Sequence, residues 1–230
     1  MSYKFIGLIV LIVNLLLSCK EDNITNPTEN DSASVKLCDL IWTTQNVNTD
    51  HYLNGDSIPE VKDPKEWVKL TTGAWCYYNN DPAMGAIYGK LYNWYAVSDS
   101  RGLAPKGWHV INESEWKILE MCMGMEQSDI DEWGPRGFVE GGKLKDTGTK
   151  LWQSPNTGAS NESGFSAIPG GRRDENGNFA DIRNSCYLWS FPDGNSAGEL
   201  GRYLYYNNAK ISRSHYNKLN GFSVRCMKNY

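Results

Sequence analysis

The chain has 230 residues, of which 22% are charged and 12% aromatic, and this is ample for one folded core. Lys and Arg number 23 against 27 Asp and Glu, so the formal net charge is -4 at pH 7. This mild acidity gives no electrostatic reason to expect binding to nucleic acid or to an anionic membrane surface. The 9 Trp and 13 Tyr predict either a dense aromatic core or partly exposed rings.

The first 18 residues predict a targeting segment rather than part of the fold. Lys4 supplies a positive start, and residues 5–17 form an apolar run that is too short for a comfortable membrane span. The run ends in Leu-Leu-Ser-Cys19, which resembles a bacterial lipobox; an ordinary signal peptide with an incidental Cys is the alternative. We therefore expect residues 1–18 to be a lipoprotein signal peptide. Lipid (palmitate) on Cys19 should then anchor the chain in the membrane, which is its expected partner.

Residues 19–34 predict a flexible tether, because they are rich in Asn, Thr, Glu, Asp and Ser and cannot bury a core. Lys20-Glu21-Asp22 resembles the surface-export signal of Bacteroidetes lipoproteins, and a merely solvated tether is an equal alternative. The expected location is the outer membrane, with the domain exposed at the cell surface. The folded domain should then span residues 35–230.

The first half of that domain predicts a strand, a helix and a short strand. The aromatic run at 74–78 is typical of a strand. Residues 88–97 predict a helix, because Leu91, Trp94 and Tyr95 fall on one helical face. Turn residues then lead to a short extended segment at 108–110.

A second helix is predicted after Asn112. Asn112 followed by Glu115 resembles a capping box, in which each residue caps the backbone N–H of the other. Trp116 and Leu119 share one face of this helix, and Gly124 suits the position that ends it.

The second half predicts mostly strands. Residues 170–183 should form a hairpin, 186–190 a strand, and 203–206 with 210–213 another hairpin. Residues 221–227 alternate with a period of two, which predicts Phe222, Val224 and Cys226 inward. Many short antiparallel strands with two helices and long irregular loops predict a single α+β domain.

Five motifs of the chain together resemble the signature of the Fibrobacter succinogenes major paralogous domain. They are YGKLYNWYAVSDSRGLAPKGWHV, ESEWKIL, GGKLK, NESGFSAIPGG and GFSVRC, in this order. The resemblance runs from about Ile41 to the C-terminus. It implies a C-type lectin-like fold, shared by the formylglycine-generating enzymes, in a lipoprotein of Bacteroidetes or related bacteria. It implies no particular activity.

Five cysteines remain besides the lipid-bearing one, and an odd number requires at least one free thiol. Cys76 and Cys226 match recurrent positions of the family and lie on predicted core strands, so the resemblance implies a disulfide between them. We expect Cys122 to be buried and to behave as a small apolar side chain. A pairing of Cys38 with Cys186 has no support from the pattern.

Catalytic and metal-binding patterns are missing from the sequence. His51, His109 and His215 are far apart and lack metal-ligand spacing, and His109 beside Trp108 predicts a structural role. No pair of cysteines matches the site of the formylglycine-generating relatives, and the calcium and sugar motifs of true C-type lectins are absent. We therefore expect neither an enzyme nor a cofactor or metal.

Exposed rings near polar loops are the remaining candidates for a ligand site. Rings can stack on sugars and polar groups can bind hydroxyls, so we expect a site from Trp152, Arg172, Trp189, Asp193, Asn195 and Tyr205. The alternative for Trp152 and Trp189 is a place in the core. The loops at 154–171 and 190–198 should share one end of the domain.

Three functions follow from these patterns, in order of preference. The first is a non-catalytic binding or adhesion module for a glycan or protein ligand, without nucleic acid. The second is a structural or accessory lipoprotein of an envelope or pilus, and the third an enzyme related to formylglycine generation.

Overall fold

The computed structural model describes residues 33–193 and 198–230, which belong to one compact unit, Ser32–Tyr230. The expected lipid site at Cys19 and the candidate residue Asn195 lie outside the described residues. Within the described ranges, every helix is too short or too polar to cross a bilayer.

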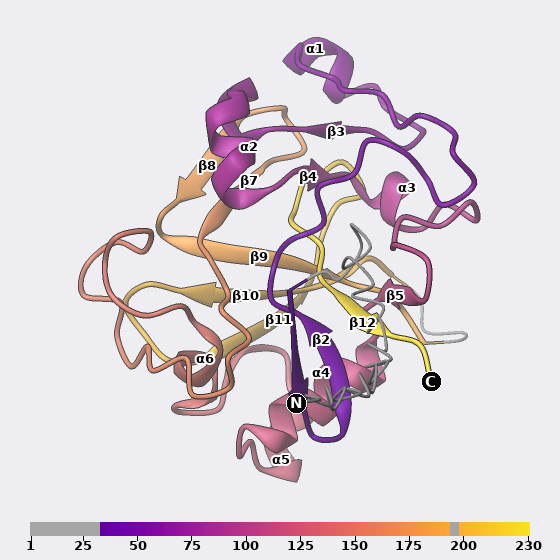
Figure 1. The fold of residues 1–230 in the computed structure, drawn as a ribbon. Helices are drawn as coiled ribbons and strands as arrows, with labels where there is room; N and C mark the ends of the chain where they lie inside the picture. Colours follow the sequence, from indigo (N-terminus) through magenta and orange to yellow (C-terminus); the bar gives the residue numbers. More distant parts are fainter. Residues whose placement is uncertain (1–32, 194–197) are drawn as a thin grey trace, which may run out of the picture. The chain divides into compact units, whose positions relative to one another are not determined.

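The domain contains short helices and many short strands (Figure 1). The helices are α1 Pro64–Trp67, α2 Pro82–Tyr88, α3 Trp94–Val97, α4 Glu113–Cys122, α5 Gln127–Ile130 and α6 Glu140–Leu144. The strands are β1 Ser34–Leu37, β2 Leu40–Thr43, β3 Trp75–Cys76, β4 Leu91–Tyr92, β5 Trp108–Val110, β6 Gly134–Arg136, β7 Gly170–Arg173, β8 Phe179–Ile182, β9 Ser185–Ser190, β10 Leu200–Tyr205, β11 Ile211–His215 and β12 Cys226–Lys228. The predicted α+β class is confirmed.

The strands form three sheets. A four-stranded sheet has the order β1-β2-β12-β5, a six-stranded sheet the order β6-β11-β10-β9-β7-β8, and β3 pairs with β4. Pairing is antiparallel except between β7 and β9. The last strand, β12, therefore lies between two strands from the first half of the chain.

Helix α4 begins and ends as its sequence predicts. Asn112 Oδ1 accepts a hydrogen bond from Glu115 N, and Glu115 Oε2 accepts one from Asn112 N, both at 2.9 Å. Trp116 and Leu119 are buried against the sheets. Gly124 follows with a φ of 103°, the left-handed conformation that ends many helices.

The single helix predicted at 88–97 is wrong. Gly89 has a φ of 75°, so α2 ends at Tyr88, and the chain continues through β4. Asn93 then caps a new turn of helix, because its Oδ1 accepts a hydrogen bond from Ala96 N at 3.0 Å. Leu91 and Trp94 are both buried, as predicted, but Leu91 lies in the strand β4 and Trp94 in the separate helix α3.

The hairpins β7–β8 and β10–β11 and the strand β9 confirm the predictions for the second half. The alternation at 221–227 is only half correct, because Ser223 and Arg225 are buried together with Phe222 and Val224. Arg225 is satisfied inside the protein: its Nε donates to Asn46 Oδ1 at 2.6 Å, and its other nitrogens donate to backbone carbonyls.

The disulfide between Cys76 and Cys226 is also wrong. Both are buried free thiols in different hydrophobic clusters. The bridge instead joins Cys38 to Cys122, whose Cα atoms are 6.3 Å apart. Cys122 lies at the exposed end of α4 and is not a buried apolar side chain. Cys186 is free as well, so the odd cysteine count is resolved by one bridge and three thiols.

Five charged side chains are buried where α4 packs on the six-stranded sheet. Arg202 donates to Glu113 through Nη1 and Nη2 (2.8 and 3.0 Å) and to Glu120 through Nε (2.7 Å). Arg213 pairs with Glu113 at 2.7 Å, and Arg136 pairs with Glu120 at 2.5 Å. Burial alone would raise the pKa of Glu113, but Arg202 and Arg213 outweigh it and hold that pKa below its ordinary value.

Candidate functional site

Trp152 and Trp189 do not reach the surface. Both are 0% exposed, and each indole N–H donates to a backbone carbonyl: Trp152 to Ala167 at 3.0 Å and Trp189 to Tyr92 at 2.8 Å. Because a sugar needs an open ring face, the structure removes both from the predicted ligand site. Their role is in the core, the alternative that aromatic burial favours.

The other predicted site residues are also held by the protein itself. Arg172 pairs with Asp181 at 3.0 Å, and its guanidinium lies 5.2 Å from the ring centre of Tyr187. Tyr205 packs edge-on against the ring of Tyr206. These contacts lie on the hairpin β7–β8 and the far end of β10, so they do not form one site with Asp193.

The two long loops lie at opposite ends of β9 and not at one end. The loop at 154–171 lies near the start of β9, since Gln153 N donates to Arg183 O at 2.8 Å. The other loop begins with Phe191, whose N–H donates to Ile111 O at 2.8 Å just beyond the end of β9. A strand of six residues separates its ends by about 17 Å.

Asp193, one of the predicted ligand-site residues, is held in place by the start of α4. Its Oδ2 accepts hydrogen bonds from Ser114 N at 2.7 Å and Ser114 Oγ at 2.6 Å, at the start of α4. The side chain is half-buried and ties the segment after β9 to this helix.

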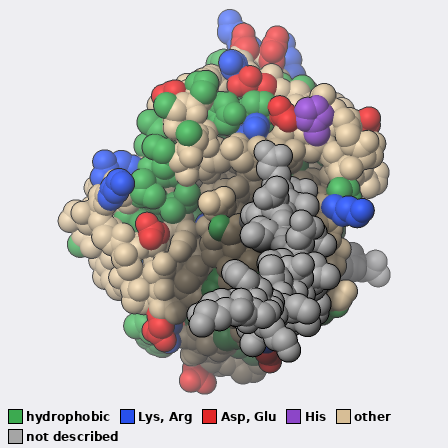
Figure 2. Space-filling model, in the orientation of Figure 1, with side chains coloured by type: hydrophobic (Ala, Val, Ile, Leu, Met, Phe, Trp, Pro, Cys, Tyr) green, Lys and Arg blue, Asp and Glu red, His purple; other side chains and the backbone are tan. Residues whose placement is uncertain are grey.

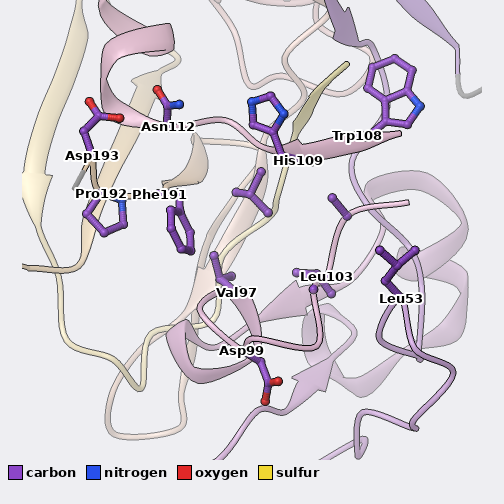
Figure 3. Close-up of a pocket in the computed structure, with 13 residues that line it drawn as sticks. Leu53, Val97, Asp99, Leu103, Trp108, His109, Asn112, Phe191, Pro192 and Asp193 are labelled. Atoms are coloured by element: carbon purple, nitrogen blue, oxygen red, sulfur yellow. The ribbon is translucent and has the colours of Figure 1, made fainter. Parts of the chain in front are cut away.

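The structure does contain an apolar cleft beside Asp193, with a volume of about 430 Å³ (Figure 3). We name it the Phe191 cleft; β5, the end of α3 and the segment after β9 contribute to it. It is lined by Leu53, Val97, Asp99, Gly102, Leu103, Ala104, Trp108, His109, Val110, Asn112, Phe191, Pro192 and Asp193. Phe191 and Pro192 lie on one side, with Leu53 and Leu103 on the other and Val97 between them (Figure 3).

Most polar groups of this cleft already have partners. His109 Nε2 lies 2.6 Å from Glu115 Oε1, and His109 Nδ1 lies 2.7 Å from Asn229 Oδ1. Arg101 donates to both carboxylate oxygens of Asp99 and lowers the pKa of that carboxyl to about 2. The imidazole therefore offers no unbonded nitrogen to act as a base, which agrees with a structural role for His109.

Two large apolar side chains remain exposed at the edges of the cleft. Leu53 is 57% exposed and Phe191 is 37% exposed. Neither was among the predicted site residues. The available signal was a large apolar residue in an otherwise polar, turn-rich segment, which for Leu53 is the turn at 51–61.

Thiol and metal chemistry find little support in the described residues. Burial raises the pKa of the thiols of Cys76, Cys186 and Cys226 to about 12, so they carry almost no thiolate at neutral pH. Within the part of the chain that the structure describes, no group of three His, Cys, Asp or Glu side chains could hold a metal ion.

Comparison with known proteins identifies the domain by its family. Residues 35–228 match the family described as Fibrobacter succinogenes major domain. No curated protein and no solved structure matches the chain. Because the matched region includes most of the chain and all of the motifs quoted above, the chain belongs to the Fibrobacter succinogenes major domain family.

Proposed function

We propose that the chain is a non-catalytic binding or adhesion module and that the Phe191 cleft holds its ligand. The observation that carries this proposal is the pair of exposed apolar side chains, Leu53 and Phe191, on opposite sides of one hollow. Exposed apolar surface on a folded protein often marks an interaction site. The buried thiols and the fully bonded imidazole of His109 support a binding role over catalysis.

The lining favours a protein ligand that inserts an aliphatic or aromatic side chain. The polar groups of His109 and Asp99 are engaged within the domain, so they are poorly placed to bind sugar hydroxyls. Asp193 Oδ1 accepts no hydrogen bond from the described residues and lies at the rim. A basic residue next to the inserted side chain would complement this carboxylate.

Replacing Leu53 by Ser should weaken ligand binding about tenfold, or roughly 1.4 kcal/mol, because an apolar contact is lost. The ligands are peptides selected from a displayed random library on the unit that begins at Ser32, and affinity is measured by calorimetry. Val68→Ser is the matched control, because Val68 is 38% exposed and lies outside the cleft.

Both variants should unfold at nearly the wild-type temperature, because both side chains are exposed. The proposal is refuted if the library yields no binder, or if selected peptides bind the Leu53→Ser variant as tightly as the wild type. Selection of peptides without apolar residues would contradict the assigned ligand class.

A second candidate, an accessory envelope or pilus lipoprotein, is favoured by one observation. Trp133, Phe138 and Val139 are 51%, 76% and 54% exposed within a single segment. Loss of binding in Val139→Ser, with Leu53→Ser unchanged, would favour this candidate.

We further propose that lipid on Cys19 anchors the chain in the outer membrane, with the domain at the cell surface. The support is the lipobox-like Leu-Leu-Ser-Cys19. Replacing Cys19 by Ala should move nearly all of the protein from the membrane fraction to the soluble fraction. Unchanged fractionation, together with an unmodified N-terminus in mass spectrometry, would contradict the proposal. Surface exposure is checked separately by protease treatment of intact cells.

A C-type lectin-like fold is also part of the proposal. It is supported by the short antiparallel strands and by β12, which brings the end of the domain beside β2 near its start. An experimental structure with a different strand order would refute it.

A further inference from the structure

A second hollow, of about 350 Å³, has the opposite chemistry to the Phe191 cleft. We name it the Asp146 hollow. It is lined by Thr44, Gln45, Asn46, Asn48, Gly85, Ala86, Ile87, Tyr88, Gly89, Asp146, Leu151, Ser166 and Ile168. We infer that the Asp146 hollow binds a neutral monosaccharide unit of a glycan, at a site separate from the Phe191 cleft.

The shape of this face agrees with a site at the hollow. Figure 2 shows the surface hollowed near the middle of the view, where Figure 1 draws the segment after β2 beside the segment before β7. These are the segments that contribute residues 44–48 and 166–168 to the lining. The volume lies within the range of about 300–1,000 Å³ that is usual for small-ligand sites.

The polar side chains of the hollow retain unused hydrogen-bonding groups. The Gln45 amide, Asn48 Nδ2 and the Asp146 carboxylate have no hydrogen-bond or ion-pair partner among the described residues. An amide N–H is a donor, and an ionised carboxylate is an acceptor only. A sugar hydroxyl both donates and accepts, so this set of groups can bind adjacent hydroxyls in both directions.

Buried cations hold two of the amides in place. Arg225 Nε donates to Asn46 Oδ1 at 2.6 Å, while Asn46 Nδ2 donates to Tyr88 O at 2.8 Å. Lys90 Nζ donates to Asn48 Oδ1 at 3.2 Å and to Asn48 O at 3.1 Å. Lys90 donates to the amide oxygen of Asn48, so the NH₂ group of Asn48 is left for a ligand. Because the Asn48 side chain is already held in place, it loses little conformational freedom when a ligand binds.

Apolar side chains of the hollow suit the remaining face of a pyranose. Ile87 is 50% exposed, and Leu151 and Ile168 are partly buried in the same lining. The C–H groups of a sugar ring form an apolar face that can contact such side chains. A sugar has both an apolar face and hydroxyl groups, so it can use an apolar wall that lies beside free donors and an acceptor. A purely apolar side chain of a peptide would leave these polar groups without partners.

The charges favour a neutral sugar over an acidic one. Asp146 lines the hollow and would repel the carboxylate of a uronic or sialic acid. Arg225 is buried behind the lining, and its donors reach Asn46 and the carbonyls of Thr43, Phe165 and Ser166. Its guanidinium is therefore already bonded and not presented to an anion.

The test titrates the unit that begins at Ser32 with methyl glycosides of glucose, galactose, mannose, fucose, N-acetylglucosamine and N-acetylgalactosamine, and with glucuronic and N-acetylneuraminic acids. Binding is followed by NMR shifts of the backbone and side-chain amides. At least one neutral glycoside should bind in the millimolar range and shift the amides of Gln45 and Asn48. Asp146→Asn should weaken that binding at least tenfold, because one carboxylate acceptor becomes a donor.

Asp129→Asn is the matched control, because Asp129 is half-buried on α5 and lies outside the hollow. The inference is overturned if no neutral glycoside shifts these amides, if only the acidic sugars bind, or if Asp146→Asn binds like the wild type. Peptide binding at the Phe191 cleft should be unchanged in Asp146→Asn, so failure at one hollow is distinguishable from failure at the other.

Discussion

Replacing Glu120 by Ala should destabilise the domain by about 3–5 kcal/mol, because two buried arginines lose their shared partner. Glu120 is 0% exposed and accepts hydrogen bonds from Arg202 and Arg136. Without its carboxylate, both guanidiniums stay in a poorly solvated site where only Glu113 carries a negative charge. The thermal midpoint should fall by roughly 10 °C, measured by calorimetry or circular dichroism.

The matched control is an ion pair on the outer side of the same helix. Lys117 Nζ lies 2.6 Å from Asp131 Oδ1, and Asp131 is 68% exposed. Removing the Asp131 carboxylate with Asp131→Ala should cost less than about 1 kcal/mol, because water replaces the lost partner. Equal losses in Asp131→Ala and Glu120→Ala would mean that burial does not set the strength of the inner network.

Removing the Cys38–Cys122 disulfide with Cys38→Ser and Cys122→Ser together should cost about 4 kcal/mol. The bridge joins residues 84 positions apart, and closing a loop of this length restricts the unfolded chain strongly. Both half-cystines are exposed, so serine leaves no cavity and the loss reports the cross-link itself. Urea unfolding followed by tryptophan fluorescence measures the difference.

Reductant provides the internal control for this measurement. Reduced wild-type protein should unfold at the midpoint of the double variant, because the same cross-link is open in both. The double variant should not respond to reductant, since Cys76, Cys186 and Cys226 are thiols. A response of the variant, or a wild-type midpoint that stays the same after reduction, would show that the bridge is assigned wrongly.

Features that depend on neighbouring residues were predictable from the sequence. The capping box of α4 requires only Asn112 and Glu115, and the hairpin β7–β8 is signalled by Asn176-Gly177, which lies in the loop between the two strands. Strand β9 was also predicted, at residues 186–190, which is within one residue of its observed start at Ser185. Each of these signals lies within a few consecutive residues, so it can be recognised in the sequence without knowledge of the tertiary contacts.

Features that depend on distant segments were missed. Trp189 was expected either at a ligand site or in the core, and the sequence alone did not decide, because the carbonyl that accepts its N–H belongs to Tyr92, 97 positions away. Cys38 meets Cys122 for the same kind of reason, because β1–β2 packs near the end of α4. The Phe191 cleft combines three segments that are far apart in the sequence. Only the structure shows that most polar groups of this cleft already have hydrogen-bond partners within the domain.

The place of β12 also constrains when the domain can be assembled. Met227 pairs with Trp42 on one side and with His109 on the other, so the first sheet is split until these late residues arrive. A chain that emerges from a ribosome or a translocation channel N-terminus first holds β2 and β5 for more than a hundred residues of growth without the strand between them. Such non-local pairing is slow to form. Completion of this sheet therefore waits for β12, and a chain that stops before Cys226 would present two unpaired strand edges, one on β2 and one on β5, to proteases.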